Sequence, residues 1–255
     1  MSLCRVGIPG AVFVCAVVLS IVSIAQAQIV LDFESGSLDD WEVISDVSLG
    51  DAGPPSWEIR NSQLGLDGKA LFQGSNIWGD TSDSCLMGTF IIYTGEKFTN
   101  FILDVDVVAA DNDGMGLVWA YEDTDKHYRA IMINDIWPDP NPLDGIGGPF
   151  MKIAKRISNA SPWYELLEVV KGGYVPYSEG TKLHWTLEVV NGDFTFTRED
   201  GLSISAEDAE YKTGYVGIQL YAQQLEIDNL TIAPGAAVRP GCKMAAMWGA
   251  IKKRP

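Results

Sequence analysis

The chain has 255 residues, of which 47% are hydrophobic, enough for one large domain with its own core. Its 34 acidic and 18 basic residues give a formal net charge of −16 at pH 7. This balance excludes nucleic acid as a partner, because phosphate binding requires a basic stripe that the sequence does not contain.

Residues 1–27 are typical of a secretory signal peptide. Arg5 supplies a short positive start, residues 11–24 are an almost unbroken apolar run, and residues 25–27 (Ala-Gln-Ala) match a cleavage pattern. The apolar run is too short for a comfortable membrane span. We therefore expect a mature protein that is secreted, periplasmic or held at the cell surface, without a membrane span.

The cysteines leave two possibilities open. Cys4 and Cys15 are removed with the signal peptide, so Cys85 and Cys242 remain. These two could pair in an oxidising compartment, but sequence alone does not place their Cα atoms within bridging range. Their spacing fits no zinc-thiolate motif.

Residues 28–233 read as many short strands separated by turn residues. Hydrophobic and polar residues alternate with a period of two, and Asn-Gly, Asp-Gly and similar pairs mark the turns. The expected strands are residues 29–34, 41–44, 56–60, 63–66, 69–73, 86–92, 101–108, 115–121, 126–133, 150–157, 164–170, 183–190, 193–198, 215–221 and 225–232. No convincing amphipathic helix interrupts them, so the sequence predicts an all-β fold, a two-sheet antiparallel β-sandwich.

Residues 100–134 are the centre of this predicted domain. The odd-numbered residues from 101 to 107 are all hydrophobic, and Asp104 and Asp106 alternate with them. Two turns follow, Asp-Asn-Asp-Gly at 111–114 and Glu-Asp-Thr-Asp at 122–125. We expect three antiparallel strands here, joined as a meander, with an apolar face that a second layer covers.

Two loops carry tryptophans. Residues 135–149 contain four prolines, three glycines and Trp137, and the polar loop at 76–84 contains Trp78. Loops as long as 135–149 in a compact domain are usually functional or disordered.

The C-terminal end differs from the domain in composition. Residues 234–242 are typical of a linker, and residues 243–255 are a basic tail. A short helix, a docking segment and disorder all remain open for the tail, because isolated helices of this length are marginal in water.

Four segments carry a family resemblance: residues 32–41 (DFESGSLDDW), 114–135, 182–201 and 214–234. In this order they resemble the opening strand, central hairpin, late hairpin and closing strand pair of the concanavalin A-like lectin/glucanase superfamily. The similarity is to its secreted bacterial laminin-G-like and thrombospondin C-terminal-like jelly rolls. These motifs are architectural, so the resemblance implies the jelly-roll fold and says little about activity.

The resemblance also implies a calcium site. In similar carbohydrate-binding sandwiches, an acid of the opening segment and an aspartate near the last strand bind one structural Ca²⁺, and these positions are Glu34 and Asp228 here. Calcium takes six to eight oxygen ligands, so backbone carbonyls and water would complete the site. The alternative is that Glu34 is a surface turn residue and Asp228 accepts bonds from neighbouring backbone amides.

Candidate ligand-binding residues follow from sugar chemistry. Sugars stack their apolar faces on aromatic rings and bond their hydroxyls to carboxylates, amides and guanidinium groups. We therefore select Trp78 and Trp137 in the loops, and Asp104, Asp106 and Arg129 as polar residues of one concave sheet face.

Catalytic motifs are weak. Asp104 and Asp106 superficially match the catalytic strand of laminarinase-type glucanases, but both glutamates of that motif are missing. Residues 111–114 fail as a calcium-binding EF-hand loop, because the first and twelfth positions are alanines. The sequence favours a secreted non-catalytic carbohydrate-binding module, with a glycan-active hydrolase or a protein-binding adhesion module as alternatives.

Overall fold

The computed structural model describes residues 27–45, 54–78, 88–135, 145–158, 160 and 162–235. Residues 1–26 of the predicted signal peptide, Trp137, Cys85, Cys242 and the basic tail lie outside this part of the chain. No helix that is long and apolar enough to span a membrane occurs in the described part.

The described residues form fifteen β-strands and no helix. The strands are β1 (Ile29–Leu31), β2 (Trp41–Ser45), β3 (Trp57–Asn61), β4 (Lys69–Gln73), β5 (Thr89–Phe98), β6 (Phe101–Ala109), β7 (Gly114–Asp123), β8 (Lys126–Ile133), β9 (Phe150–Arg156), β10 (Tyr164–Val170), β11 (Lys182–Val190), β12 (Asp193–Arg198), β13 (Ser203–Glu207), β14 (Gly214–Tyr221) and β15 (Leu225–Pro234).

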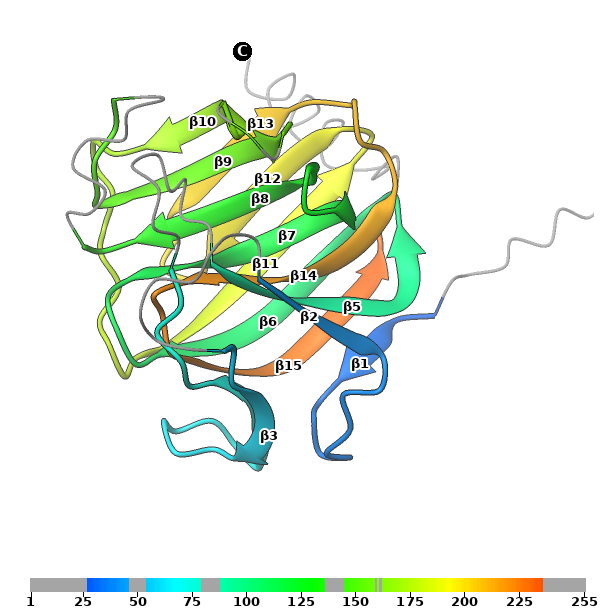
Figure 1. Ribbon diagram of the computed structural model, residues 1–255, viewed down its shortest axis with the longest axis vertical. Coiled ribbons are helices and arrows are strands. Elements are labelled where there is room, and N and C mark those ends of the chain that lie inside the picture. The colour runs from blue at the N-terminus through cyan, green and yellow to red at the C-terminus, as the bar shows by residue number, and fades with distance from the viewer. Residues whose placement is uncertain are drawn as a thin grey trace, which may run out of the picture.

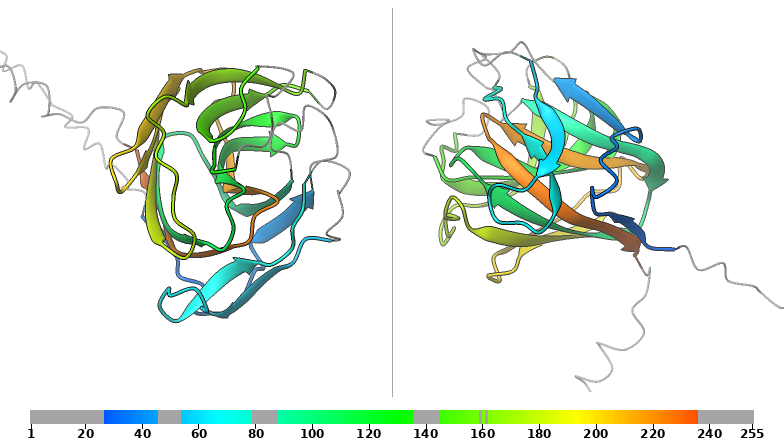
Figure 2. Two further views of the ribbon diagram at one scale, coloured as in Figure 1. Left: turned by 90° about the vertical axis from the view of Figure 1, so that its left-hand side faces the viewer. Right: turned by 90° about the horizontal axis from the view of Figure 1, so that it is seen from below.

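These strands make two antiparallel sheets that face each other as layers (Figures 1 and 2). The eight-stranded sheet has the order β13-β12-β11-β6-β15-β4-β3, with β1 paired to β15. The seven-stranded sheet has the order β10-β9-β8-β7-β14-β5-β2. The predicted all-β, two-sheet antiparallel jelly-roll sandwich is confirmed.

The predicted hairpin at Asn191-Gly192 is also confirmed. Both residues have positive φ, 54° and 90°, as the two central residues of a type I′ turn require. The turn sets the register in which Val190 faces Asp193 across β11 and β12. The alternation of β11 then buries every second residue, from Leu183 to Val189.

The expected meander is wrong at its first connection. β7 and β8 form a hairpin in the seven-stranded sheet, but β6 pairs with β11 and β15 in the other sheet. The intervening turn crosses between the layers, and its backbone carbonyls are held there. Asp111 accepts a bond from Gln223 at 3.0 Å, and Asn112 accepts one from the backbone amide of Asn134 at 3.0 Å. The apolar faces of β6 and β7 therefore meet across the core.

The expected strand at 63–66 is absent, because a buried carboxylate organises that segment as a loop. The Glu226 carboxylate accepts bonds from the backbone amides of Gln63 and Leu64 at 2.9 Å each. It also accepts the Ser62 hydroxyl at 2.6 Å and the Arg60 guanidinium at 3.1 Å. Strand β13 was not expected, since Ile204 is the one large hydrophobic residue in its sequence Ser-Ile-Ser-Ala-Glu.

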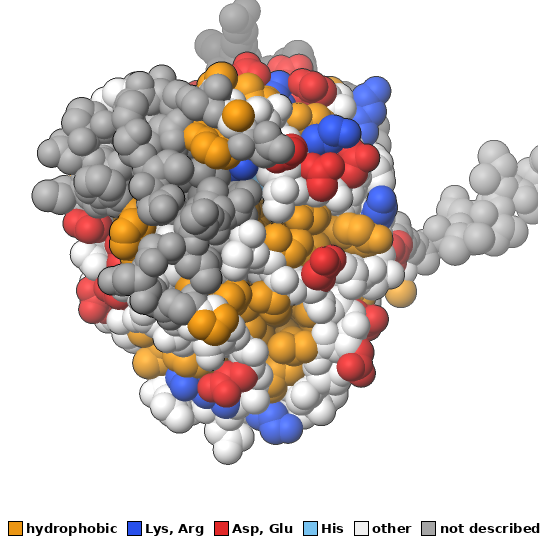
Figure 3. All heavy atoms as spheres, in the orientation of Figure 1, with side chains coloured by type: hydrophobic (Ala, Val, Ile, Leu, Met, Phe, Trp, Pro, Cys, Tyr) orange, Lys and Arg blue, Asp and Glu red, His pale blue; other side chains and the backbone are white. Residues whose placement is uncertain are grey.

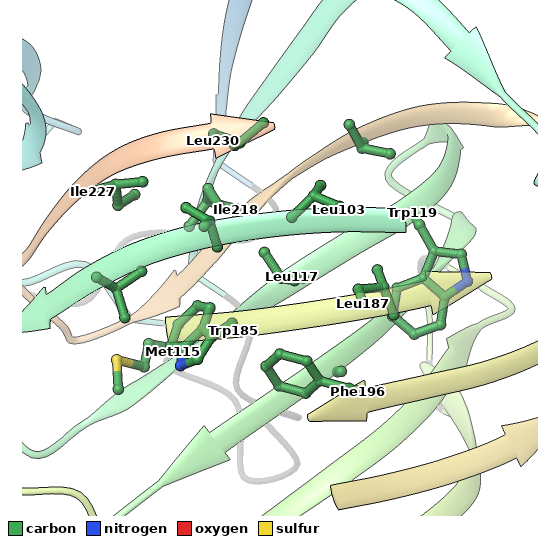
Figure 4. Close-up of a cluster of buried hydrophobic side chains, with 14 of the residues drawn as sticks. Leu103, Met115, Leu117, Trp119, Trp185, Leu187, Phe196, Ile218, Ile227 and Leu230 are labelled. Carbon is green, nitrogen blue, oxygen red and sulfur yellow. The ribbon is translucent and has the colours of Figure 1, made fainter. Parts of the chain in front are cut away.

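The core lies between the layers and draws on almost every strand (Figure 4). Its largest members are tryptophans: Trp119 packs against Phe194 with ring centroids 5.1 Å apart, and Trp185 packs edge-on against Phe196 at 5.6 Å. Leucines and isoleucines such as Leu103 fill the space around them. Each fully buried aliphatic or aromatic side chain contributes about 1.5–3 kcal/mol, so this layer is the main source of stability.

Replacing Glu226 by glutamine tests the loop anchor. Burial tends to raise the pKa of this carboxyl, but its donors, from the Ser62 hydroxyl to the Arg60 guanidinium, lower it below its usual value. The anchor therefore stabilises the protein above the ordinary glutamate pKa and is lost as pH falls through the lowered one. We expect Glu226→Gln to reduce the free energy of unfolding by about 2–4 kcal/mol at pH 7, measured by urea denaturation, and to flatten its acid dependence.

Glu58→Gln is the matched control for this measurement. Glu58 lies 3.8 Å from the same guanidinium but its side chain is exposed, so its loss should change the free energy of unfolding by less than about 0.5 kcal/mol. Equal effects of the two substitutions would show that the buried anchor contributes nothing beyond an exposed pair.

Candidate functional site

Asp104 and Asp106 lie on the outer face of the eight-stranded sheet. Leu103 and Val105, which alternate with them along β6, point into the core. Across the pairing with β11, Asp104 faces Thr186 and Asp106 faces His184. The strand alternation therefore presents two carboxylates, a hydroxyl and an imidazole side by side.

The Asp106 carboxylate is saturated with donors. His184 donates to it from Nδ1 at 2.8 Å, Asn229 from Nδ2 at 3.0 Å, and the Lys182 ammonium lies 2.8 Å away. Burial raises the pKa of this carboxyl, but the bonds from Lys182, His184 and Asn229 outweigh burial and lower it. Asp106 is therefore an ionised, fixed acceptor.

His184 lies between the two carboxylates. Its Nε2 is 3.5 Å from Oδ1 of Asp104, and the same Oδ1 accepts the Thr186 hydroxyl at 2.6 Å. The side chains of His184 and Asp104 are 42% and 35% exposed, so molecules in solution reach both.

A row of short polar side chains extends this group across five strands. Register places them opposite one another in the order Ser203, Thr197, Thr186, Asp104 and Thr231, from β13 to β15. The hydroxyls of Thr197 and Ser203 bond at 3.1 Å. We call this row, together with Asp106, Lys182 and His184, the polar strip.

Asp228 lies beside the polar strip, opposite Asp106 in the pairing of β15 with β6. It is only 4% exposed, and its Oδ1 has no hydrogen-bond partner. Burial raises its pKa to about 6; the backbone amide of Asn229 opposes this, and the negative charges of Glu34, Asp106 and Asp32 add to it. This carboxylate therefore lies in an excess of negative charge.

Glu34 is held at the exposed opening turn. Its Oε1 accepts the backbone amide of Lys69 at 2.8 Å, and the Lys69 ammonium donates to its backbone carbonyl at 3.0 Å. The carboxylate lies over Gly68, where a β-carbon would come within 1.9 Å of Oε1. The positive φ of 64° favours glycine at position 68, and a larger residue there would displace the carboxylate that joins the opening turn to β4.

The chemistry of these groups suits calcium in part. The buried Oδ1 of Asp228 has no hydrogen-bond partner, and the negative charge of Glu34 raises the pKa of the Asp228 carboxyl. A calcium ion between the two carboxylates would need an oxygen ligand and negative charge of this kind. Within the described ranges, however, no cluster of three or more acidic, histidine or cysteine side chains is arranged to hold a metal ion. Backbone carbonyls and water would have to supply the remaining ligands.

Arg129 is not brought to Asp104 and Asp106. It lies on β8 of the seven-stranded sheet, on the face opposite to Tyr128 and Ala130, which point into the core. The two aspartates and Arg129 are therefore on opposite outer faces of the sandwich, and the expected shared face is wrong. The order of the strands decides which sheet each residue belongs to, and the sequence does not reveal that order.

Trp78 lies on the same side as Arg129. It packs against a cluster that includes Ile131 and Phe150, on the outer face of the seven-stranded sheet. Figure 3 views the molecule from this side, where hydrophobic side chains gather across the middle of the face. Arg129 is 1% exposed, and its guanidinium lies 5.4 Å from the Tyr164 ring centroid.

The sequence analysis selected Asp104 and Asp106 but no other member of the polar strip, and it also missed Asn229, which donates to Asp106. The alternation of residues 183–190 places His184 and Thr186 on the outward face, and this pattern could have been read from the sequence. The register that brings them to Asp104 and Asp106, and the positive φ of 52° that orients Asn229, were not readable.

No protein-family model and no curated protein sequence matches the chain. Solved structures do. The carbohydrate-binding module CBM66 from Bacillus subtilis matches with a TM-score of 0.50 and 15% identity, over 76% of this chain and 95% of that one. A Bacillus subtilis protein of unknown function with a galectin-like fold matches with a TM-score of 0.52 and 11% identity, over 82% and 97%. These similarities concern the fold, a jelly roll of the concanavalin A-like and galectin type.

The raised pKa of Asp228 gives a test of this site. Between the ordinary aspartate pKa and about 6, the folded protein binds this proton more tightly than the unfolded chain, so the contribution of Asp228 to stability falls as pH rises. We expect Asp228→Asn to raise the melting temperature at pH 7.5 by roughly 2–4 °C in chelator, and to flatten the profile between pH 4 and 6.

Asp39→Asn serves as the control, because it removes one charge from an exposed residue of the opening segment. Its profile should follow the wild type. If Asp228→Asn melts at a lower temperature than the wild type in chelator at pH 7.5, then the Asp228 carboxylate does not destabilise the fold through an excess of negative charge.

Proposed function

We propose that the chain is a secreted, non-catalytic carbohydrate-binding protein that holds a glycan on the polar strip. The observation that carries this proposal is the exposed His184, fixed between Asp104 and Asp106 in a row of hydroxyl side chains. Sugar hydroxyls both donate and accept hydrogen bonds, so a surface of carboxylates, hydroxyls and an imidazole can pair with several of them.

Preorganisation supports the proposal. Apart from Lys182 and His184, the strip residues have short side chains on paired strands, and several bond to one another, as Thr186 does to Asp104 and Thr197 to Ser203. Such side chains lose little rotamer entropy when a ligand binds, which raises affinity for a given number of contacts.

The fold is compatible with this function. CBM66, which is a carbohydrate-binding module, has a similar fold at a TM-score of 0.50. Because one fold hosts many functions, the proposal depends on the chemistry of the polar strip.

Trp78 and Trp137 remain candidates for further sugar contacts, whereas Arg129, at 1% exposed, is too buried to meet a ligand. Trp78 belongs to the opposite outer face, so it would serve a second glycan segment and not the one on the strip.

Structural calcium is a second part of the proposal, with Glu34 and Asp228 as ligands. The unpaired Oδ1 of Asp228 and the neighbouring negative charges support it. A bound cation would offset this charge and fix the opening segment to β15, beside the strip. The site would then stabilise the binding face without touching the sugar.

A hydrolase on the same face is the second candidate. The pKa of Asp106 is lowered and that of Asp228 is raised, the opposite directions that an acid and base pair requires. The burial of Asp228 Oδ1 argues against it, because a general acid must reach the glycosidic oxygen. Release of reducing sugar from a polysaccharide panel would favour this candidate.

Glycan-array binding tests the proposed function. We expect the wild-type protein to bind at least one class of glycan, and Asp104→Ala and His184→Ala each to weaken that binding about tenfold or more, since each removes hydrogen bonds to the ligand. Glu42→Ala, an exposed acid on β2 of the other sheet, should leave affinity unchanged.

Trp78→Ala and Trp137→Ala belong to the same array experiment. Binding that falls in Trp78→Ala and persists in Asp104→Ala would move the site to the opposite face, and a loss in Trp137→Ala would assign the loop at 135–149 to the site. Silence of the wild-type protein on every glycan would favour a protein-binding adhesion module.

Melting with calcium and with chelator tests the metal site. A calcium concentration about 100 times the dissociation constant stabilises the folded state by about 2.7 kcal/mol, which corresponds to roughly 5–10 °C for a domain of this size. We expect this rise in the wild type and its loss in Glu34→Gln and Asp228→Asn. An identical wild-type midpoint under both conditions removes calcium from the proposal.

A further inference from the structure

A cavity of about 290 Å³ lies at one end of the sandwich, and no residue of the polar strip lines it. Three connections enclose it: the β5–β6 turn at Thr99 and Asn100, the β11–β12 turn at Asn191, and the β13–β14 connection that contains Lys212. Small-molecule sites begin at about 300 Å³, so this volume suits a ligand with a single ring.

Aromatic rings form the inner wall of the cavity. Phe194 and Tyr211 line it, and the ring of Tyr128 joins them, 4.7 Å from Phe194 and 5.3 Å from Tyr211. Two bonds fix Tyr211: its hydroxyl donates to the carbonyl of Arg156 at 3.0 Å, and its backbone amide donates to the Tyr128 hydroxyl at 3.0 Å. The wall is thus rigid and suited to the apolar face of a sugar ring.

The rim of the cavity is rich in hydrogen-bond donors. The backbone amide of Asn191 donates to Oδ1 of Asn100 at 2.7 Å, which identifies that atom as the acceptor and leaves the Asn100 side-chain NH₂ as a donor. The hydroxyls of Thr99 and Thr213 bond to each other at 2.7 Å. Lys212 and Asn191 also line the cavity, and their side chains carry further donors. A ligand that matches this rim must offer acceptors.

The charge of the cavity is opposite to that of the chain. Lys212 is the one charged residue among the nine that line it, and none of the nine is acidic, whereas the whole chain carries −16. Asp208 and Glu210 adjoin the wall and add negative charge at Tyr211, but both bond to the Lys155 ammonium at 2.9 Å, so an anionic group meets Lys212 with no acid in the lining itself.

We propose that this cavity binds a single anionic sugar ring, a hexuronate, with its apolar face against Tyr211 and its carboxylate toward Lys212. The hydroxyls and ring oxygen would accept from Asn100 and Asn191. This site is separate from the polar strip and does not depend on the function proposed for it.

Calorimetric titration with glucuronate, glucose and cyclohexanecarboxylate tests the proposal. A ligand of this size with ordinary efficiency binds with a dissociation constant on the order of 1 mM. We expect the wild type to bind glucuronate in this range, and to bind glucose and cyclohexanecarboxylate at least about tenfold more weakly, because each lacks one of the two matched features.

Two variants of residues that line the cavity and two of residues outside it locate the site. Asn100→Asp keeps the acceptor for the Asn191 amide and replaces the donor by a negative oxygen, and Lys212→Gln removes the cation. Each should weaken glucuronate binding about tenfold or more, and Lys212→Gln should leave glucose binding unchanged. Lys126→Gln, which removes the same charge outside the cavity, and Asp104→Ala in the polar strip should bind glucuronate like the wild type.

Two results with the wild type and Lys212→Gln would each overturn the proposal. One is the absence of saturable glucuronate binding at concentrations on the order of 10 mM, and the other is equal affinity of the wild type and Lys212→Gln for glucuronate. If Asn100→Asp does not fold, Lys212→Gln still tests the site, because the Lys212 side chain is exposed and its replacement leaves the core intact. Glucuronate binding that is lost in Asp104→Ala assigns the ligand to the polar strip instead.

Discussion

The pairing of β6 with β11 on one side and β15 on the other is the constraint on which the rest of the structure depends. In this register Val105 lies opposite Trp185 inside the core, and Asp106 lies opposite His184 on the outer face. A slip of one residue would turn Asp104 and Asp106 into the core and expose the hydrophobic residues. Burying two unpaired carboxylates costs several kcal/mol, so the same register that assembles the core also assembles the polar strip.

Much of the fold could be predicted because period-two alternation and turn dipeptides are local signals. The β7–β8 and β11–β12 hairpins follow from them directly. The pairing of β6 could not, since the partners of β6 are about 80 and 120 residues further along the chain and the turn at 111–114 looks like that of a hairpin. The local alternation within β6 correctly places Asp104 and Asp106 on one face. The expectation that Arg129 joins them is wrong, because it depends on which strands pair over long distances in sequence.

The carboxylates whose pKa values are shifted fall into two groups according to their donors. Glu226 and Asp106 are buried among several donors, which lower their pKa values despite burial. Asp113 and Asp228 have nearby acids instead, and burial and these charges raise their pKa values to about 7 and about 6. The first group stabilises the fold at neutral pH, whereas the second destabilises it unless protons or cations compensate. Asp113 is therefore a second position at which the folded protein holds a proton near neutrality.

Strand alternation in β11 has a consequence for how such a domain changes over time. His184 and Thr186 point outward, while Leu183, Trp185 and Leu187 between them fill the interior. Outward positions can exchange without altering the packed layer, because neighbouring residues of a strand serve opposite faces. The residues proposed to bind a ligand and the residues that stabilise the core are therefore different residues of one strand. Proteins descended from one ancestor with this fold can therefore acquire different ligands through substitutions at outward positions alone, without any change in the packed interior.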